Sequence, residues 1–367
     1  VDGNIAGTDN IKMPVNLDHG QTIVFLAGTT DAADAAIQAD LQLAIMDTAV
    51  KTYSVGITAA TNDNDITVTA SDKSADAVAT SLGATKDVGT AFLQAVQAVT
   101  NDTAADAAAE DTFGNLLSHL GGNTAADVSA LALQVAPQTD SIGGSSIATK
   151  AMTGTVQGIV SNRMASLRSG DAFVTGMSAG NGMSANSGFI QAFGSEGEQK
   201  NTSSSGATVF GHDTETSGVA VGFDGMTDSG STIGLSASYS TTDVEGKGTG
   251  KSKNSIDSYT VSAYADKATE NGYIEGSLTY GINDNTATRI VNTAGLNRAY
   301  SANYDSQQIS LKVGGGVPNE VADNTFVTPF VSATATNINT DAYTEKSSVS
   351  GDALRLRTSQ DDINSLV

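Results

Sequence analysis

The segment 187–367 is dominated by short stretches in which apolar and polar residues alternate. In the stretch 231–239, Ile233 and Leu235 fall on one face of an extended chain, and glycine and hydroxyl side chains fall on the other, because successive side chains of a strand point to opposite sides. The same alternation recurs at 218–223, 274–280 and 308–313. The pattern predicts a sheet with one apolar face and one polar face.

The connections between these stretches distinguish a membrane barrel from a soluble sandwich. Strands are expected at 188–196, 213–224, 231–243, 255–266, 273–289, 304–317, 325–338 and 351–363. The second, fourth and sixth connections are then short, and the others are long and polar. Outer-membrane barrels alternate tight periplasmic turns with longer outer loops in this way, whereas a Greek-key sandwich has no reason to do so. We therefore expect a mainly β fold containing an antiparallel outer-membrane β-barrel.

Composition and charge narrow the ways in which this chain can meet a membrane or a partner. No stretch reaches the ~18 consecutive apolar residues of a spanning helix, so insertion would have to use strands. The net charge of -22 argues against nucleic acid as a partner, because phosphate binding needs clustered Lys and Arg. The sequence begins at Val1 with no signal peptide before it, so we expect a processed or cut product.

The N-terminal part divides into a β segment and a helical segment. Within 1–72, short strands are expected at 13–17, 22–26, 53–59 and 66–70, together with an alanine-rich helix over 32–47. From about Ser74 to Pro137 the apolar spacing changes from two to nearly four, as in Phe92 and Val96. This spacing predicts amphipathic helices that pack against the rest of the chain.

A slim helix is expected over 147–168. Its residues are mostly small or hydroxylic, and its only charges are Lys150, Arg163 and Arg168. At 1.5 Å per residue these residues span roughly 33 Å, about the thickness of the hydrocarbon layer of a membrane. A basic helix in so acidic a chain needs an acidic or strongly polar surround.

The order of these segments resembles that of the autotransporters of the type V secretion family. The stretches that carry the resemblance are Val160–Arg168, Phe189–Gly194, Ser217–Phe223, Ile233–Ser240, Thr328–Phe330 and Arg355–Asp362. Each motif is loose, and their order is the specific part. The resemblance implies a translocator that anchors in the outer membrane and exports its own N-terminal passenger, leaving a helix in the lumen of a twelve-stranded barrel.

The resemblance also implies a division of the chain and a set of partners. Residues 1–72 would end a β-solenoid-like passenger, 73–140 would form a helical junction, 141–186 would hold the lumen helix and a linker, and 187–367 would form the barrel. The partners would be outer-membrane lipid, the barrel-assembly machinery and the chain's own passenger.

The candidate site residues are charges expected in the lumen. Lys150, Arg163 and Arg168 would lie on the lumen helix, and Glu275 and Lys312 would lie on inward-facing positions of the barrel. Glu275 and Lys312 would pair with Arg163 or with each other. No catalytic, cofactor-binding or metal-binding residues are expected.

The sequence departs from the family pattern in two ways. It reaches Val367 after about eight strands, so we expect a truncated barrel that lacks four strands. The alternative is a complete eight-stranded barrel, whose lumen would be filled by its own side chains and would leave no room for a helix. Asn162 is followed by Arg163 rather than by a second Asn, so self-cleavage in the helix is not expected.

Several motifs of enzymes and metal sites occur in unsuitable contexts. The sequence Gly176–Gly180 matches a nucleophile elbow, but no helix pattern follows its serine. The Gly246–Ser252 stretch lacks the first glycine of a phosphate loop. A calcium loop counted from Asp63 would place Ser74 where a Glu is needed. His19, His119 and His212 have no second ligand at metal-binding spacing.

Two alternative functions remain open from the sequence alone. The chain would be a surface fibre or adhesin if its β segments were soluble and self-associating. It would belong to a passenger enzyme if catalytic residues preceded Val1.

Overall fold

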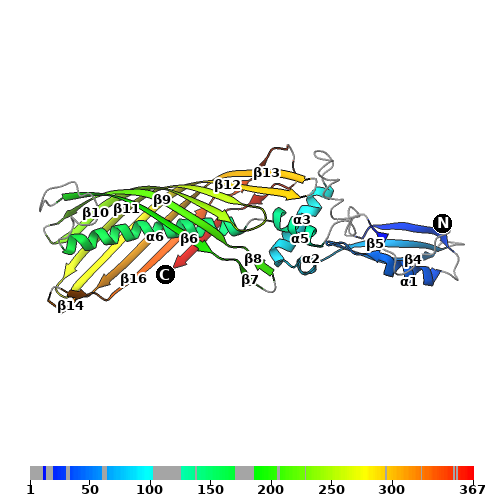
Figure 1. Ribbon diagram of the computed structural model, residues 1–367, viewed down its shortest axis with the longest axis horizontal. Coiled ribbons are helices and arrows are strands. Elements are labelled where there is room, and N and C mark those ends of the chain that lie inside the picture. The colour runs from blue at the N-terminus through cyan, green and yellow to red at the C-terminus, as the bar shows by residue number, and fades with distance from the viewer. Residues whose placement is uncertain are drawn as a thin grey trace.

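The computed structural model describes residues 11–13, 20–29, 34–59, 64–101, 125–136, 139–169, 186–204, 207–227, 229–293, 296–323, 325–349, 352 and 354–367. They form three parts along one long axis: a curved sheet that surrounds a long helix, a group of shorter helices, and a small β-rich unit near the N-terminus (Figure 1). The stretch 176–180, which matches a nucleophile elbow in sequence and is predicted to be a linker, and the residues His19 and His119 lie outside the described residues.

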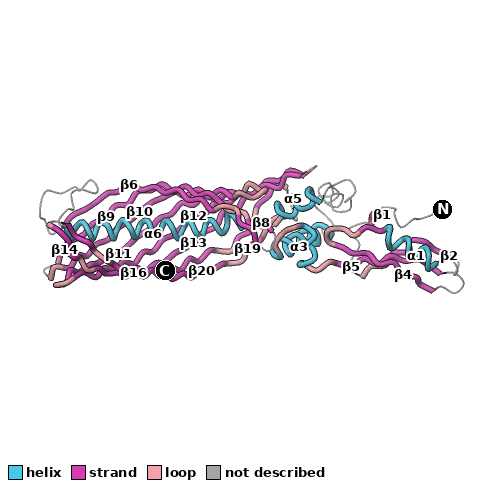
Figure 2. Tube along the Cα trace, turned by 60° about the horizontal axis from the view of Figure 1, so that its bottom comes forward, coloured by secondary structure: helices cyan, strands magenta, loops and turns pink. Residues whose placement is uncertain are grey.

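The main sheet is antiparallel, and its strands lie in sequence order. Its eight successive strands are β6 (Asn186–Gln199), β9 (His212–Met226), β10 (Ser231–Gly246), β11 (Lys253–Thr269), β12 (Gly272–Thr293), β13 (Leu296–Gly316), β16 (Phe330–Thr340) and β20 (Asp361–Leu366). The sheet curls around helix α6 (Thr139–Ser169), which lies along its concave side (Figures 1 and 2). Within the described residues no pairing joins β6 to β20, so the sheet is open between them. The antiparallel β fold expected from the alternation is confirmed.

The two faces of the sheet have the predicted polarity. On the outward face Leu235 is 66% exposed, and on the concave face its neighbour Ser236 is 7% exposed. This parity continues across the pairing, because Leu235 lies opposite Phe223 and Ala263, and all three point outward. The outward face is apolar and unpartnered, and the concave face is hydroxyl-rich and covered by α6.

Three connections differ from those expected. In the loop predicted over 290–303, residues 290–293 and 296–303 are strand, since β12 and β13 pair up to Thr293 and Leu296. Within the turn predicted over 318–324, residues 319–322 form β14 (Asn319–Ala322), which pairs with β15 (Thr325–Val327). The last strand is shorter than the predicted 351–363, and the preceding connection holds β17 (Tyr343–Thr344), β18 (Lys346–Ser347) and β19 (Arg357–Thr358). The first connection holds a further hairpin of β7 (Thr202–Ser204) and β8 (Ala207–Val209).

The helical part packs on the outer ends of β12 and β13. It contains α2 (Ala75–Leu82), α3 (Lys86–Asn101) and α5 (Ala125–Val135). Apolar residues at helical spacing, such as Phe92 and Val96, are buried as predicted. Their cluster also contains Val291 of β12, Tyr300 of β13 and Leu354. One hydrophobic core therefore joins the helices to the mouth of the sheet. None of the described helices is long and apolar enough to cross a membrane.

The N-terminal unit has its own small core. Its sheet has the order β2 (Thr22–Thr29), β5 (Asn64–Asp72), β4 (Lys51–Ala59), and α1 (Asp34–Ala44) packs against it. A short parallel pair is formed by β1 (Ile11–Lys12) and β3 (Ile45–Met46). Both pairings within the three-stranded sheet are antiparallel. This arrangement differs from the parallel rungs of the β-solenoid expected for this segment.

Candidate functional site

Helix α6 presents a narrow apolar stripe to the concave face of the sheet. Met152, Val156, Val160 and Met164 recur at helical spacing, and each is about 1% exposed. Val160 and Met164 contact Tyr264 of β11. Ile147, the first residue of the helix expected over 147–168, lies off this stripe and is 57% exposed. The small residues between these positions allow a whole helix to lie within the curve of the sheet.

The inner end of α6, on the side of the short turns, is fixed by a buried ion pair. The Arg163 guanidinium donates to both oxygens of Asp224 on β9, at 2.8 and 3.0 Å, and to Ser187 Oγ at 2.5 Å. Tyr264 and Ser187 also donate to Asp224, at 3.0 and 2.5 Å. The Arg163 and Asp224 side chains are 7% and 1% exposed. Asp224 therefore accepts hydrogen bonds from three different residues, and the buried charges of Arg163 and Asp224 are partners of each other.

A second arginine, about one and a half turns further along α6, bridges two other strands. Arg168 donates to Asp266 of β11 at 2.5 Å and to Glu275 of β12 at 3.2 Å. Its guanidinium carbon lies 3.7 Å from the centre of the Tyr273 ring, within the range of a cation–π interaction. These contacts fix the axial position and the rotation of the helix C-terminus relative to the sheet.

The middle of α6 is held by hydrogen bonds to β13. Thr153 donates to Gln308 Oε1 at 2.6 Å, Gln157 donates to Ser310 Oγ at 3.1 Å, and Lys312 Nζ donates to Ser161 Oγ at 2.9 Å. The two acceptor residues Gln308 and Ser310 are about 1% exposed. The hydroxyl-rich composition of the helix is therefore used to satisfy polar groups of the wall.

The outer end of α6 is held by the glycine-rich connection between β10 and β11. Asp140, in the first turn of the helix, accepts from Gly248 N at 2.8 Å and from Ser252 Oγ at 2.9 Å. The stretch that resembles a phosphate loop thus surrounds a carboxylate of the same chain. Nearby, Ser145 of α6 accepts from Asn254 of β11 at 2.7 Å.

Two adjacent glycines of α6 should respond in opposite directions to alanine. A Cβ on Gly144 would lie 2.7 Å from His212 Cγ and 2.8 Å from Val244 Cγ1, whereas a Cβ on Gly143 would meet nothing within 4 Å. Gly144→Ala should lower the free energy of unfolding by about 1–3 kcal/mol through overpacking. Gly143→Ala should raise it by about 0.5–1 kcal/mol through helix propensity. Urea titration of the two variants measures both, and stabilisation by both would place α6 away from β9 and β10.

The mouth of the sheet at the outer end contains another buried arginine. Arg289 of β12 donates to the Glu345 carboxylate at 3.0 and 2.6 Å and to the carbonyl of Leu354 at 3.0 Å. It also donates to the carbonyl of Gln134 on α5 at 2.9 Å. Its guanidinium carbon lies 4.2 Å from the centre of the Tyr300 ring. Arg289 therefore links the helical part, the sheet and the connection that follows β16.

The candidate residues predicted from the sequence lie along the helix and the concave face, but their predicted ion pairs differ from those in the structure. Glu275 lies on the concave face but pairs with Arg168, not with Arg163 or Lys312. Lys312 contacts Ser161 of the helix. Lys150 is half-buried, and within the described part of the chain it has no ion pair.

Sequence reasoning missed the acidic partners Asp140, Asp224 and Asp266. Asp224 lies two residues after Gly222, and Asp266 lies two residues after Tyr264, so each shares the inward face of the earlier residue. Continuing the alternation to the end of each strand would therefore have placed both aspartates on the concave face. Among the described residues no group of three or more His, Asp or Glu is arranged to hold a metal ion. The described contacts hold a helix inside a sheet.

Comparison with known proteins shows which family the sheet resembles. Residues 188–367 match the sequence profile of the autotransporter β-domain family. Among solved structures, the chain is similar to the translocator domain of the autotransporter NalP from Neisseria meningitidis, with 18% sequence identity and a TM-score of 0.46, over 61% of this chain and 68% of that one. No curated protein sequence matches the chain. Residues 188–367 thus belong to the autotransporter β-domain family, a domain of the outer membrane.

Proposed function

We propose that the β-domain exports the chain's own N-terminal passenger to the cell surface and then retains α6 in its lumen. In this proposal residues 1–72 are the end of the passenger, 73–140 are a junction at the outer mouth, 141–186 are the lumen helix and its linker, and 187–367 are the translocator. The domain acts as an anchor and a conduit, with no catalytic residues.

The observation that carries the proposal is the set of contacts that holds α6 against the concave face. Arg163 and Arg168 pair with carboxylates of three different strands, and these side chains are at most 16% exposed. Buried charges are costly unless they are paired, so the sheet and the helix have complementary polar surfaces. A soluble fibre would not explain a long helix in the curve of a sheet whose other face is apolar and exposed.

The same geometry supports the proposed partners. The outward face, with large apolar side chains such as Phe223 at 76% and Ile274 at 61% exposure, suits outer-membrane lipid. The open edges of β6 and β20 present unpaired backbone groups, which must be paired inside a bilayer. We propose that the barrel-assembly machinery guides the sheet into the membrane in a paired state.

Accessibility of tags on intact cells tests the direction of export. A peptide tag fused to Val1 should be reached by antibody and by protease on intact cells. The same tag inserted in the short turn between Thr269 and Gly272 should be reached only after the outer membrane is permeabilised, because short turns face the periplasm. Protection of the N-terminal tag on intact cells, with the barrel assembled, would contradict export of the passenger.

A further inference from the structure

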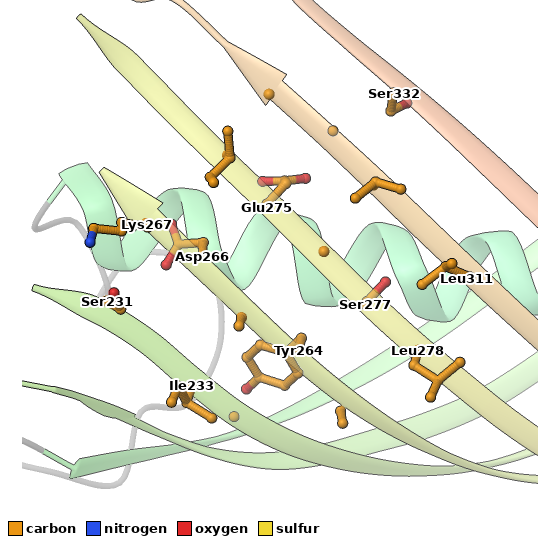
Figure 3. A pocket seen from close by; sticks show the side chains of 18 of the residues that line it. Ser231, Ile233, Tyr264, Asp266, Lys267, Glu275, Ser277, Leu278, Leu311 and Ser332 are labelled. Atoms are coloured by element: carbon orange, nitrogen blue, oxygen red, sulfur yellow. The ribbon is translucent and has the colours of Figure 1, made fainter. Parts of the chain in front are cut away.

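The outward face of the sheet contains an open groove near its short-turn end. It has a volume of about 1120 Å³ and is lined by residues of β10, β11, β12, β13 and β16 (Figure 3). This part of the surface is distinct from the α6 contacts, because the side chains that form the groove's walls point away from the helix.

The groove exists because small residues lie between rows of large ones. The outward positions along its floor are Ala263 and Ala265 of β11 and Gly276 of β12, and Ala265 lies opposite Gly276. On one side the wall is Ile233 and Leu235 of β10, which lie opposite Ala265 and Ala263. The other wall is formed by apolar residues of the next strands: Ile274, Leu278, Leu311 and Val313. The result is a trough with an apolar lining that runs along the strand direction.

One end of the groove carries a positive charge, and the other end is closed. Lys267 and Ser231 are cross-strand neighbours on the outward face and lie together at the end nearest the short turns (Figure 3). Within the described residues Lys267 is exposed and forms no ion pair. At the other end the next outward position of β11 is Val261, which is 57% exposed and stands above the alanine floor.

The length of the groove fits one leaflet of a membrane. From Lys267 to Ala263 the strand advances four residues, roughly 13 Å at about 3.3 Å per residue. Because barrel strands tilt by about 35–45° from the membrane normal, the groove spans about 10 Å in depth, which lies within one half of the ~30 Å hydrocarbon core. The ammonium group of Lys267 then stands at the level of the periplasmic headgroups, since short turns face the periplasm.

We propose that this groove is a binding site for one phospholipid of the periplasmic leaflet. An acyl chain would lie along the floor between the two walls, and the phosphate would accept from Lys267 Nζ and Ser231 Oγ. This assignment rests on the proposed placement of the sheet in the outer membrane, and it goes further by naming one site and one class of lipid. Elsewhere on the outward face, lipid would exchange freely.

Native mass spectrometry of the full chain with added dioleoyl phosphatidylglycerol tests the site. The unmodified protein should retain one lipid after the detergent is removed by collisional activation. Ala265→Leu, which fills the floor, should abolish this retention, while Ala237→Leu, the same change on the outward face of β10 beyond the groove, should not. Lys267→Gln should reduce the retained fraction about fivefold, the effect expected for one lysine near an anionic headgroup. Lys200→Gln, an exposed lysine in the first outer connection, should leave it unchanged.

Two outcomes would overturn the proposed site: retention of no lipid by the unmodified protein, or equal loss in Ala265→Leu and Ala237→Leu. A separate reporter checks the placement in the membrane. The chain has no Trp, so Val221→Trp, on the outward face of β9 away from the groove, gives a single signal. Quenching of this Trp by brominated lipid in vesicles, combined with either negative result, would refute the groove alone. Absence of quenching would refute both the groove and the membrane placement.

Discussion

Arg163→Met should lower the free energy of unfolding by about 3–5 kcal/mol, the cost typical of removing one partner of a buried ion pair. The loss arises because Asp224 would remain buried without its ionic partner. Its side chain is 1% exposed, so without Arg163 a carboxylate would stay buried with only Ser187 and Tyr264 as donors. Urea titration in lipid vesicles measures the loss, and hydrogen exchange of α6 amides shows whether the helix leaves the sheet first.

Two further variants separate the charge from its geometry. Arg163→Lys keeps the charge but loses the two-pronged contact with Asp224, so its cost should be intermediate. The double variant Arg163→Met with Asp224→Leu removes both charges and should recover much of the loss. A full loss in the double variant would mean that the side chains matter for packing and not as an ion pair. A loss below about 1 kcal/mol in Arg163→Met would indicate that the pair is solvated, as surface pairs are.

The faces of the sheet could be predicted from the sequence because the alternation has a period of two. Once Leu235 was assigned to the outward face, the parity of Ser236 and of every paired neighbour followed. The strand residues that pair with α6 could not be predicted in this way. Which carboxylate pairs with Arg163 depends on the rotation of α6 and on the stagger of the strands. A local sequence pattern determines neither.

The lengths of the elements were harder to predict than their existence. Near the mouth, both faces of β12 and β13 carry polar residues, so the alternation that marked the membrane part is lost while the pairing continues. Helix α6 begins at Thr139 and not near Ile147. The residues Gly143 and Gly144 have poor helix propensity. The contact of Asp140 with the connection between β10 and β11 and the contact of Ser145 with β11 override it.

The small N-terminal unit illustrates a different limit. The helix predicted over 32–47 corresponds to α1 at Asp34–Ala44, because an alanine-rich stretch has high helix propensity. The order of its strands did not follow from their sequences. Short strands pair in several ways with similar local patterns, and here β5 lies between two strands that it meets in antiparallel fashion.

The second large effect is expected at the outer mouth. Arg289→Met should lower the free energy of unfolding by about 3–5 kcal/mol, because the Glu345 side chain is 9% exposed and would lose its ionic partner. The carbonyls of Gln134 and Leu354 would lose a charged donor at the same time. Hydrogen exchange of α5 and of the strand ends measures the change, and protection of the α5 amides should fall.

The location of the loss distinguishes a docked junction from a general weakening of the fold. The cluster that contains Val291, Tyr300 and Leu354 also contains Phe92 and Leu131 of the helices, so Arg289 supports a shared core and not an isolated contact. Protection should therefore fall in α5 and at the mouth but persist in β9 and β10, which Arg289 does not touch. Lys346→Met, an exposed change in the same connection, should stay within about 0.5 kcal/mol. Equal loss of protection in α5 and β10 would mean that the sheet unfolds as one unit, and unchanged protection in α5 would mean that the junction is held by its apolar core alone.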